Sequence, residues 1–134
     1  MGVALKNTII GFIGAGNMAT SLIKGLLARG KVPSKILAAD VDAEKIESLY
    51  KNTGIEIRSN QQIADQADLI VLAVKPQVIE SVCLDLNLPP VSSKLIVSIA
   101  AGTTVIQLEK WLGSSTAIVR CMPNTPALIG KGTS

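Results

Sequence analysis

The sequence predicts an α/β protein with a doubly wound parallel sheet of about six strands in the order 3-2-1-4-5-6. Short apolar runs alternate with stretches of helical periodicity along nearly the whole chain. A glycine-rich turn separates the first apolar run from the first helical stretch. Apolar residues make up 48% of the chain and aromatic residues only 2%. Val, Ile, Leu and Ala must therefore fill the core, as they do in parallel strands covered on both faces.

Residues Thr8 to Ala19 predict a strand, a tight loop and the start of a helix. Gly14, Gly16 and Ala19 have the spacing of the dinucleotide fingerprint G-x-G-x-x-G/A. Gly14 can adopt the positive φ of a tight turn, and Gly16 has no Cβ to block the approach of a pyrophosphate. Ala19 is small enough for the helix to pack on the strand, and the first free N–H groups of that helix then face the phosphates.

Lys35 to Ala39 form the next expected strand, and Asp40 ends it. Asp40 lies 26 positions after Gly14 and 21 after Ala19. The dinucleotide fingerprint places its ribose-binding acidic residue at about this distance, roughly 20 positions on. The alternative is an ordinary strand-to-helix turn in which glycine serves only the backbone geometry.

The following helix is expected to start after Asp42, which suits an N-cap. Its apolar face is expected to comprise Ile46, Leu49 and Tyr50. Glu56 to Arg58 are expected to form a short strand, and Asn60 to cap a brief helix that runs through Ala67.

A buried strand is expected over Leu69 to Ala73, followed by a helix with Pro76 in its first turn. The apolar face of that helix comprises Ile79, Val82, Cys83 and Leu86, and Leu88-Pro89-Pro90 ends it. Leu95 to Ile99 form the next expected strand. Thr104 and Gln107 then have capping-box spacing before a helix that buries Leu108, Trp111 and Leu112. Ala117 to Arg120 form the last expected strand.

In this sheet order the ligand crevice lies at the carboxyl ends of the strands, between the first and the fourth. The segments after Ile13, Ala73 and Ile99 are therefore expected to line it. Lys75 is the one charge in the two later segments. It either packs its stem on Pro76 with a solvated ammonium, or faces the phosphates of a cofactor or an anionic substrate.

Composition excludes several other classes of protein. With 134 residues the chain suits one domain, and its apolar runs are far shorter than a membrane-spanning helix. The net charge of +3 is spread singly, so we interpret it as solvated surface and expect no nucleic-acid partner. Weak attraction of an anionic cofactor is the alternative. Cys83 and Cys121 lack metal-site spacing and the chain has no histidine, so we expect no metal and a reduced, cytoplasmic setting.

The segment after the last expected strand carries polar groups between two prolines. Pro123 and Pro126 flank Asn124 and Thr125 and make the loop stiff. The loop either holds these polar side chains in a binding site or is a rigid segment that leaves the domain. Cys121 has no histidine partner, which argues against a thiolate nucleophile.

The scarcity of side chains suited to donate a proton limits the kinds of reduction that this chain could catalyse. Reduction of a carbonyl leaves an alkoxide that an acid must protonate, whereas this chain has no histidine and one tyrosine, Tyr50, on the second expected helix. Hydride transfer to a protonated imine mainly requires that cofactor and substrate are held face to face. A second domain could still supply an acid.

Four stretches together resemble pyrroline-5-carboxylate reductase. They are Gly11 to Ala19, Ala73 to Pro76, Ala100 to Gly102 and Arg120 to Pro126. The resemblance implies that a hydride from NAD(P)H reduces the cyclic imine 1-pyrroline-5-carboxylate to L-proline, the last step of proline synthesis. The cofactor contacts that it implies come from Ile13, Gly14, Ala15, Gly16, Asn17, Met18, Asn60, Ala73, Val74, Lys75, Pro76, Ala100, Ala101 and Gly102. Lys75, Asn124 and Thr125 are the candidates near the nicotinamide.

The resemblance also implies a helical C-terminal domain that interlocks two subunits and binds the substrate. We interpret residues 1–134 as the NAD(P)-binding Rossmann domain, and residues 121–134 as the start of its exit toward that absent domain. The fragment alone is expected to be inactive, and the full-length protein to be a dimer or higher homo-oligomer. Family members often place Ser, Asn or Arg after the second strand, suited to a 2′-phosphate, whereas Asp40 here favours NADH over NADPH.

Two other functions share the opening motif. One is a β-hydroxyacid dehydrogenase-like or coenzyme F420-linked reductase, which the loop from Arg120 to Pro126 argues against. The other is a non-catalytic Rossmann module that senses NAD and gates a partner.

Overall fold

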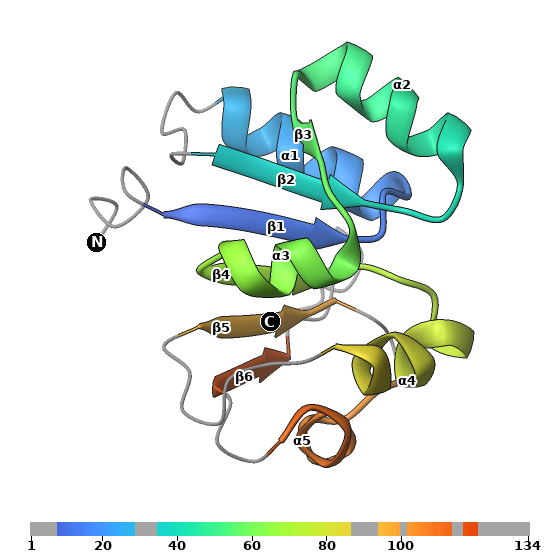
Figure 1. Ribbon diagram of the computed structural model, residues 1–134, viewed down its shortest axis with the longest axis vertical. Coiled ribbons are helices and arrows are strands. Elements are labelled where there is room, and N and C mark those ends of the chain that lie inside the picture. Colours follow the sequence, from blue (N-terminus) through green and yellow to red (C-terminus); the bar gives the residue numbers. More distant parts are fainter. Residues whose placement is uncertain (1–7, 29–34, 87–93, 100–101, 114–116, 121–134) are drawn as a thin grey trace, which may run out of the picture.

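The computed structural model describes residues 8–28, 35–86, 94–99, 102–113 and 117–120 (Figure 1). These residues form one six-stranded parallel sheet in the order β3-β2-β1-β4-β5-β6, which confirms the predicted topology. The strands are β1 (Ile9–Ile13), β2 (Lys35–Ala39), β3 (Glu56–Ile57), β4 (Leu69–Leu72), β5 (Leu95–Ser98) and β6 (Ala117–Arg120). The helices are α1 (Asn17–Ala28), α2 (Ala43–Thr53), α3 (Asn60–Gln66), α4 (Pro76–Asp85) and α5 (Val105–Leu112).

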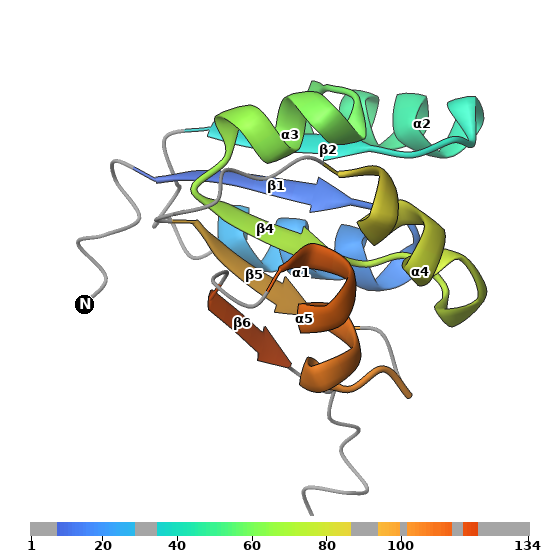
Figure 2. The ribbon, with the colours of Figure 1, turned by 60° about the horizontal axis from the view of Figure 1, so that its bottom comes forward.

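Helices cover both faces of the sheet, and each face has its own core. Figure 2 shows α1 behind the sheet and α4 and α5 in front of it. Phe12 belongs to a cluster with residues of α1 and α2, whereas Ile13 belongs to a cluster with residues of α3, α4 and α5. Successive side chains of β1 therefore enter opposite cores, as the alternation of a strand requires. In the described part of the chain, no helix is both long and apolar enough to cross a membrane.

Gly11, in the middle of β1, allows α3 to lie close against the sheet. A Cβ at this position would overlap Cγ2 of Ile63 and would lie 3.1 Å from Cβ of Ala67. In the sequence, Gly11 interrupts the apolar run from Ile9 to Ile13. In the fold it is a packing requirement, because α3 could not keep its present distance from β1 above a larger residue.

Three helices begin with side-chain caps. The Asp42 carboxylate accepts the N–H groups of Glu44 and Lys45 at the start of α2, and Thr104 forms a capping box at the start of α5, as expected. The expected cap at Asn60 is wrong. Ser59 caps α3 instead, because its side chain pairs with Gln62 in a capping box and Asn60 becomes the first helical residue.

Some expected boundaries and faces differ from the structure. Tyr50 is 48% exposed, because it lies at the rim of the buried face of α2. Helix α4 ends at Asp85, with Leu86 as its C-cap. Residues 88–90, which were expected to end this helix, lie outside the described residues. Arg58, Ala73 and Ile99 fall just outside their strands. Each nevertheless donates its N–H to the neighbouring strand, to Ala38, Ile13 and Leu72 respectively.

Candidate dinucleotide site

The glycine loop, residues 14–16 between β1 and α1, is wedged between the ends of two other strands. Gly14 has φ +108°, as the turn requires. A Cβ there would lie 2.6 Å from the carbonyl oxygen of Ala73, so only glycine fits between the loop and the end of β4. On the other side, the N–H of Gly14 donates to the carbonyl of Ala39 at 2.8 Å. The loop is thus fixed at the point where the strand order reverses.

Gly16 faces open space, unlike Gly14. A Cβ at Gly16 would meet no atom within 4 Å. Ala19, one turn into α1, is fully buried in the cluster that contains Phe12. The three positions of the fingerprint therefore have different surroundings: one is tight against backbone, one is open, and one is packed into the core.

Two cavities meet at the glycine loop. The α1–α2 cavity has a volume of about 890 Å³. Its lining includes Ala15, Gly16, Asn17, Met18, Thr20, Asp42, Lys45, Ala73, Val74, Lys75, Pro76 and Ile99. The β2–α4 cavity has a volume of about 540 Å³. Its lining includes Ile13, Gly14, Gly16, Asp40, Val41, Asp42, Lys45, Asn60, Ala73, Val74, Lys75, Val78, Ser81, Val82 and Asp85.

Nearly all the described candidates from the sequence line these cavities. The segments after β1 and β4, together with Asp40 and Asn60, come together there, and Ile99 adds the end of β5. Gly102 has φ +80°, is exposed, and lines neither cavity. Ala100, Ala101, Cys121, Asn124 and Thr125 lie outside the described residues.

Helix α4 also contributes to the site, which was not predicted from the sequence. Val78, Ser81, Val82 and Asp85 line the β2–α4 cavity from one face of this helix. Their spacing of three and four residues was the available signal, because α4 starts at the carboxyl end of β4.

Helix α1 begins at the cavities without a side-chain cap. Gly16 precedes it and has no side chain, and no acidic residue lies in its first turn. The first intrahelical bond runs from the N–H of Thr20 to the carbonyl of Gly16, so the N–H groups of residues 17–19 precede the hydrogen-bond ladder. Such donors, together with the helix dipole, form an anion-binding position.

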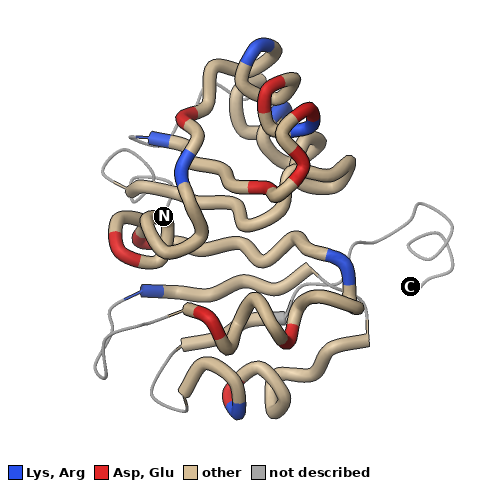
Figure 3. The backbone as a smooth tube through the Cα atoms, turned by 45° about the vertical axis from the view of Figure 1, so that its right-hand side comes forward, with Lys and Arg blue, Asp and Glu red and all other residues tan. Residues whose placement is uncertain are grey.

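The charges at the cavities have both signs. In Figure 3 the basic and acidic positions of the described chain are interspersed. Lys45 and Lys75 are the two basic residues that line both cavities. Lys75 is the N-cap residue of α4 and makes no side-chain capping bond. A cation at a helix N-terminus is unfavourable by itself, and an anion bound between Lys75 and α1 would offset this.

The Asp40 carboxylate accepts two backbone N–H groups. Oδ2 accepts from Ala15 and Oδ1 accepts from Asp42, each at 2.7 Å. Asp40 does not cap α2, since the Asp42 side chain accepts the N–H of Glu44 at the start of that helix. Asp40 is half-buried and also lines the β2–α4 cavity, beside the fully exposed Val41.

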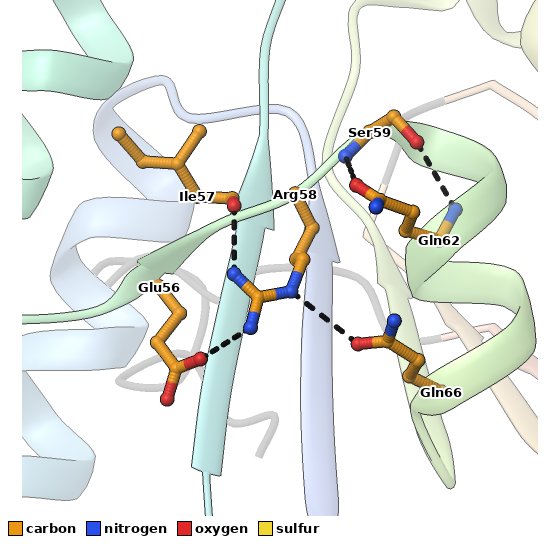
Figure 4. Close-up of polar contacts among 6 residues, drawn as sticks. All are labelled: Glu56, Ile57, Arg58, Ser59, Gln62 and Gln66. Carbon is orange, nitrogen blue, oxygen red and sulfur yellow. Dashed lines mark hydrogen bonds and ion pairs between the residues drawn. The ribbon is translucent and has the colours of Figure 1, made fainter.

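Arg58 follows β3 but lines neither cavity. Figure 4 shows its guanidinium bound to the Glu56 carboxylate, the carbonyl of Ile57 and the side chain of Gln66. The bond to Gln66 connects Arg58 to α3, which begins with the capping box of Ser59 and Gln62. Arg58 thus stabilises the connection that places Asn60 at the β2–α4 cavity.

Cys83 belongs to the core and not to the site. Its side chain is fully buried on α4, and burial raises the pKa of its thiol to about 11. A neutral, buried thiol is neither a nucleophile nor a metal ligand.

Comparison with known proteins confirms the resemblance. A pyrroline-5-carboxylate reductase from Pseudomonas aeruginosa is 48% identical over 126 residues, which are 93% of this chain and 46% of that protein. The solved structure of the Coxiella burnetii pyrroline-5-carboxylate reductase matches with a TM-score of 0.78 and 38% identity, over 92% of this chain and 46% of that one. The Plasmodium falciparum pyrroline carboxylate reductase, solved with NADP bound, matches with a TM-score of 0.76 and 34% identity, over 94% of this chain and 46% of that one.

The chain therefore spans about half the length of the relatives that it matches. One family's sequence model covers residues 9–102, from the start of β1 to the loop after β5. The glycine loop, both cavities and the β1/β4 reversal lie within that range, and the chain belongs to this family, described as NADP oxidoreductase, coenzyme F420-dependent.

Proposed function

We propose that this chain is the NAD(P)-binding domain of a pyrroline-5-carboxylate reductase, which reduces 1-pyrroline-5-carboxylate to L-proline. The uncapped start of α1, open beside Gly16 and flanked by Lys75, is the observation that carries the proposal. It is a position for the diphosphate of a dinucleotide. The similarity to pyrroline-5-carboxylate reductases over 93% of the chain supplies the substrate class.

The residues of this chain then bind and orient the cofactor, which supplies the hydride when bound. The N–H groups at the start of α1 and the Lys75 ammonium hold the diphosphate. Ala73 and Val74 line both cavities and would hold the nicotinamide end of the cofactor. The resemblance to pyrroline-5-carboxylate reductase adds the loop from Ala100 to Gly102 to this proposal. Asn60 lines the cavity at the adenosine end, and Asn124 and Thr125 remain candidates near the nicotinamide.

We further propose that NADH is preferred. Asp40 places a carboxylate at the β2–α4 cavity, where it can accept hydrogen bonds from the ribose hydroxyls and repels a 2′-phosphate. Val41 offers no guanidinium, although Lys45 lines the same cavity and opposes the effect of Asp40. The Plasmodium falciparum relative binds NADP, so this preference would distinguish the present chain from that protein.

The organisation of the full-length protein is part of the same proposal. Residues 1–134 form the cofactor domain, 121–134 lead to a helical domain that binds substrate, and the whole protein is a homo-oligomer in a reduced, cytoplasmic setting. The relatives are about twice as long as this chain, which supports a further domain.

A second candidate is an F420-linked reductase, because the family description names coenzyme F420. The loop from Arg120 to Pro126, which argues against it, lies outside the range that the family covers. Reduction of NADP by reduced F420 is the assay that would favour this candidate.

Turnover of 1-pyrroline-5-carboxylate by the purified 134-residue chain and by the full reading frame tests the proposal. We expect NAD(P)H oxidation by the full-length protein and little or none by the chain alone, because hydride transfer depends steeply on substrate positioning. Equal turnover by the two proteins would contradict the assignment of the substrate site to a second domain. A full-length protein inactive on this imine would contradict the proposed substrate.

A further inference from the structure

Asp40 joins three segments of the chain through its carboxylate. It follows β2 directly, and its Oδ2 reaches across 25 residues of sequence to the N–H of Ala15 in the glycine loop. Its Oδ1 accepts the N–H of Asp42, which leads into α2. Both distances are 2.7 Å, within the short range of bonds to a charged acceptor, which are about twice as strong as neutral ones.

The glycine loop is tied to the end of β2 at two consecutive residues. The N–H of Gly14 donates to the carbonyl of Ala39, and the N–H of Ala15 donates to Asp40. The backbone of Ala73 limits the loop on its other side. The Ala15 bond is the one of these restraints that depends on a side chain, so it is the one that a substitution can remove.

We infer that Asp40 is a positioning residue of the glycine loop, which sets the affinity for the diphosphate shared by NADH and NADPH in addition to facing the adenosine ribose. The inference rests on the proposed function, in which this loop holds the dinucleotide. Since the N–H of Ala15 is taken by Asp40, the donors directed to the diphosphate begin after Ala15, at Gly16 and the first turn of α1. Removal of the carboxylate releases the residue immediately before those donors.

The two roles of Asp40 predict different changes in affinity. If Asp40 acted only on the ribose, its removal would weaken NADH and strengthen NADPH, because the hydrogen bonds and the repulsion would disappear together. A positioning role weakens both cofactors, because both use the same diphosphate position. Asp40→Ala removes both acceptor oxygens and is the appropriate substitution.

Asp42→Asn is a matched control. Asp42 lines the same two cavities, and an asparagine keeps the cap of α2, so this variant removes one negative charge near the site without releasing the loop. The Asp42→Asn variant therefore measures how much the loss of one negative charge by itself raises the affinity for an anionic ligand.

The test combines amide hydrogen exchange of the ligand-free chain with titrations of NADH and NADPH. In Asp40→Ala we expect exchange at Ala15 to accelerate about tenfold or more, the effect of losing a charge-assisted hydrogen bond, while exchange at Phe12 within β1 stays unchanged. Both dissociation constants are expected to rise about fivefold or more. Asp42→Asn should leave exchange at Ala15 unchanged, and its dissociation constants give the effect of removing one negative charge without releasing the loop.

Unchanged exchange at Ala15 in Asp40→Ala would overturn the inference, as would opposite changes in the affinities for NADH and NADPH. If the wild-type chain bound neither cofactor, the proposed function would fail, and the role in affinity would fail with it. The exchange measurement, which needs no ligand, would still decide whether Asp40 holds the loop.

Discussion

The candidate site consists of backbone N–H donors and a few charged side chains of both signs. Gly14 and Gly16 shape the loop in different ways, the first by close contact with Ala73 and the second by leaving space. At the β2–α4 cavity, Lys45 and Lys75 offer positive charge, whereas Asp40 and Asp42 offer negative charge. Under the proposed function, the choice between NADH and NADPH depends on this balance of charge.

Paired substitution of Asp40 and Val41 should shift the cofactor preference. In Asp40→Ser with Val41→Arg, the repulsion of a 2′-phosphate is replaced by a guanidinium able to bind it. We expect the ratio of NADPH to NADH affinity to rise about tenfold or more, the effect of roughly 1.4 kcal/mol. Any change in the loop is common to both cofactors and cancels in this ratio. Fluorescence titrations with both cofactors measure it, and an unchanged ratio would rule out a role of Asp40 in selectivity.

Cys83 should make the free energy of unfolding depend on pH in alkali. Its pKa is raised from 9.0 to about 11 in the folded protein, so the unfolded chain loses the proton first as the pH rises. The stabilisation is complete below pH 9 and is lost as the pH approaches 11, by about 2–3 kcal/mol for this shift. Urea unfolding from pH 8 to 11 should therefore show a steeper loss for the wild type than for Cys83→Ala. Parallel curves would show that the thiol is not protected from ionisation.

The residues that the sequence could predict are those with a fixed spacing. The fingerprint indicates Gly14, Gly16 and Ala19, because each position has a separate steric requirement. The bond between Asp40 and Ala15 could not be predicted, since it depends on a side-chain rotamer and on the distance between two loops. Spacing indicated only that Asp40 ends a strand near the ligand.

The strands and helices near the glycine loop differ in how they pack and in how they are capped. Strand β1 contributes to both cores, and α3 lies directly over its Gly11. Helix α1 starts at the cavities uncapped, whereas α2, α3 and α5 each have a side-chain cap. The residue before each of these three helices caps it, whereas α1 and α4, which both begin at the cavities, have no side-chain cap. The first N–H groups of α1 are the donors that the proposed function assigns to a ligand.

Gly11→Ala should destabilise the protein, because the new methyl group would overlap Ile63 and press on Ala67. We expect a loss of about 1–3 kcal/mol, typical of overpacking in a core. Gly25→Ala is the matched control. Gly25 is exposed on α1 with no atom within 4 Å of an added Cβ, so this change should stabilise the helix by about 0.5–1 kcal/mol. Urea unfolding measures both, and equal effects would show that α3 does not pack on Gly11 as described.

The order of elements could be predicted because apolar runs and helical faces alternate regularly. Boundaries were less accurate where two adjacent residues can both serve as a cap, as Ser59 and Asn60 can. The contacts of Gly11 with α3 involve residues about 50 positions apart, for which local periodicity carries no signal.

In the described part of the chain, one six-stranded sheet carries the candidate site at one point of its strand order. The sheet order places the reversal between β1 and β4, and both cavities lie there. This arrangement could be predicted, since a doubly wound sheet fixes where its ligand crosses. The residues that would contact the substrate could not, because the chain spans about half of its relatives and the loop with Asn124 and Thr125 lies outside the described residues.

Titration of NADH into the wild-type chain and into Gly16→Val is the sharpest test of dinucleotide binding at the start of α1. Gly16 faces open space, so valine should leave the circular dichroism spectrum and the Tm close to the wild-type values. Its side chain would nevertheless occupy the position of the pyrophosphate. We expect saturable binding by the wild type and none by Gly16→Val. Equal binding by the two folded proteins, or none by the wild type, would show that the start of α1 is not the dinucleotide site.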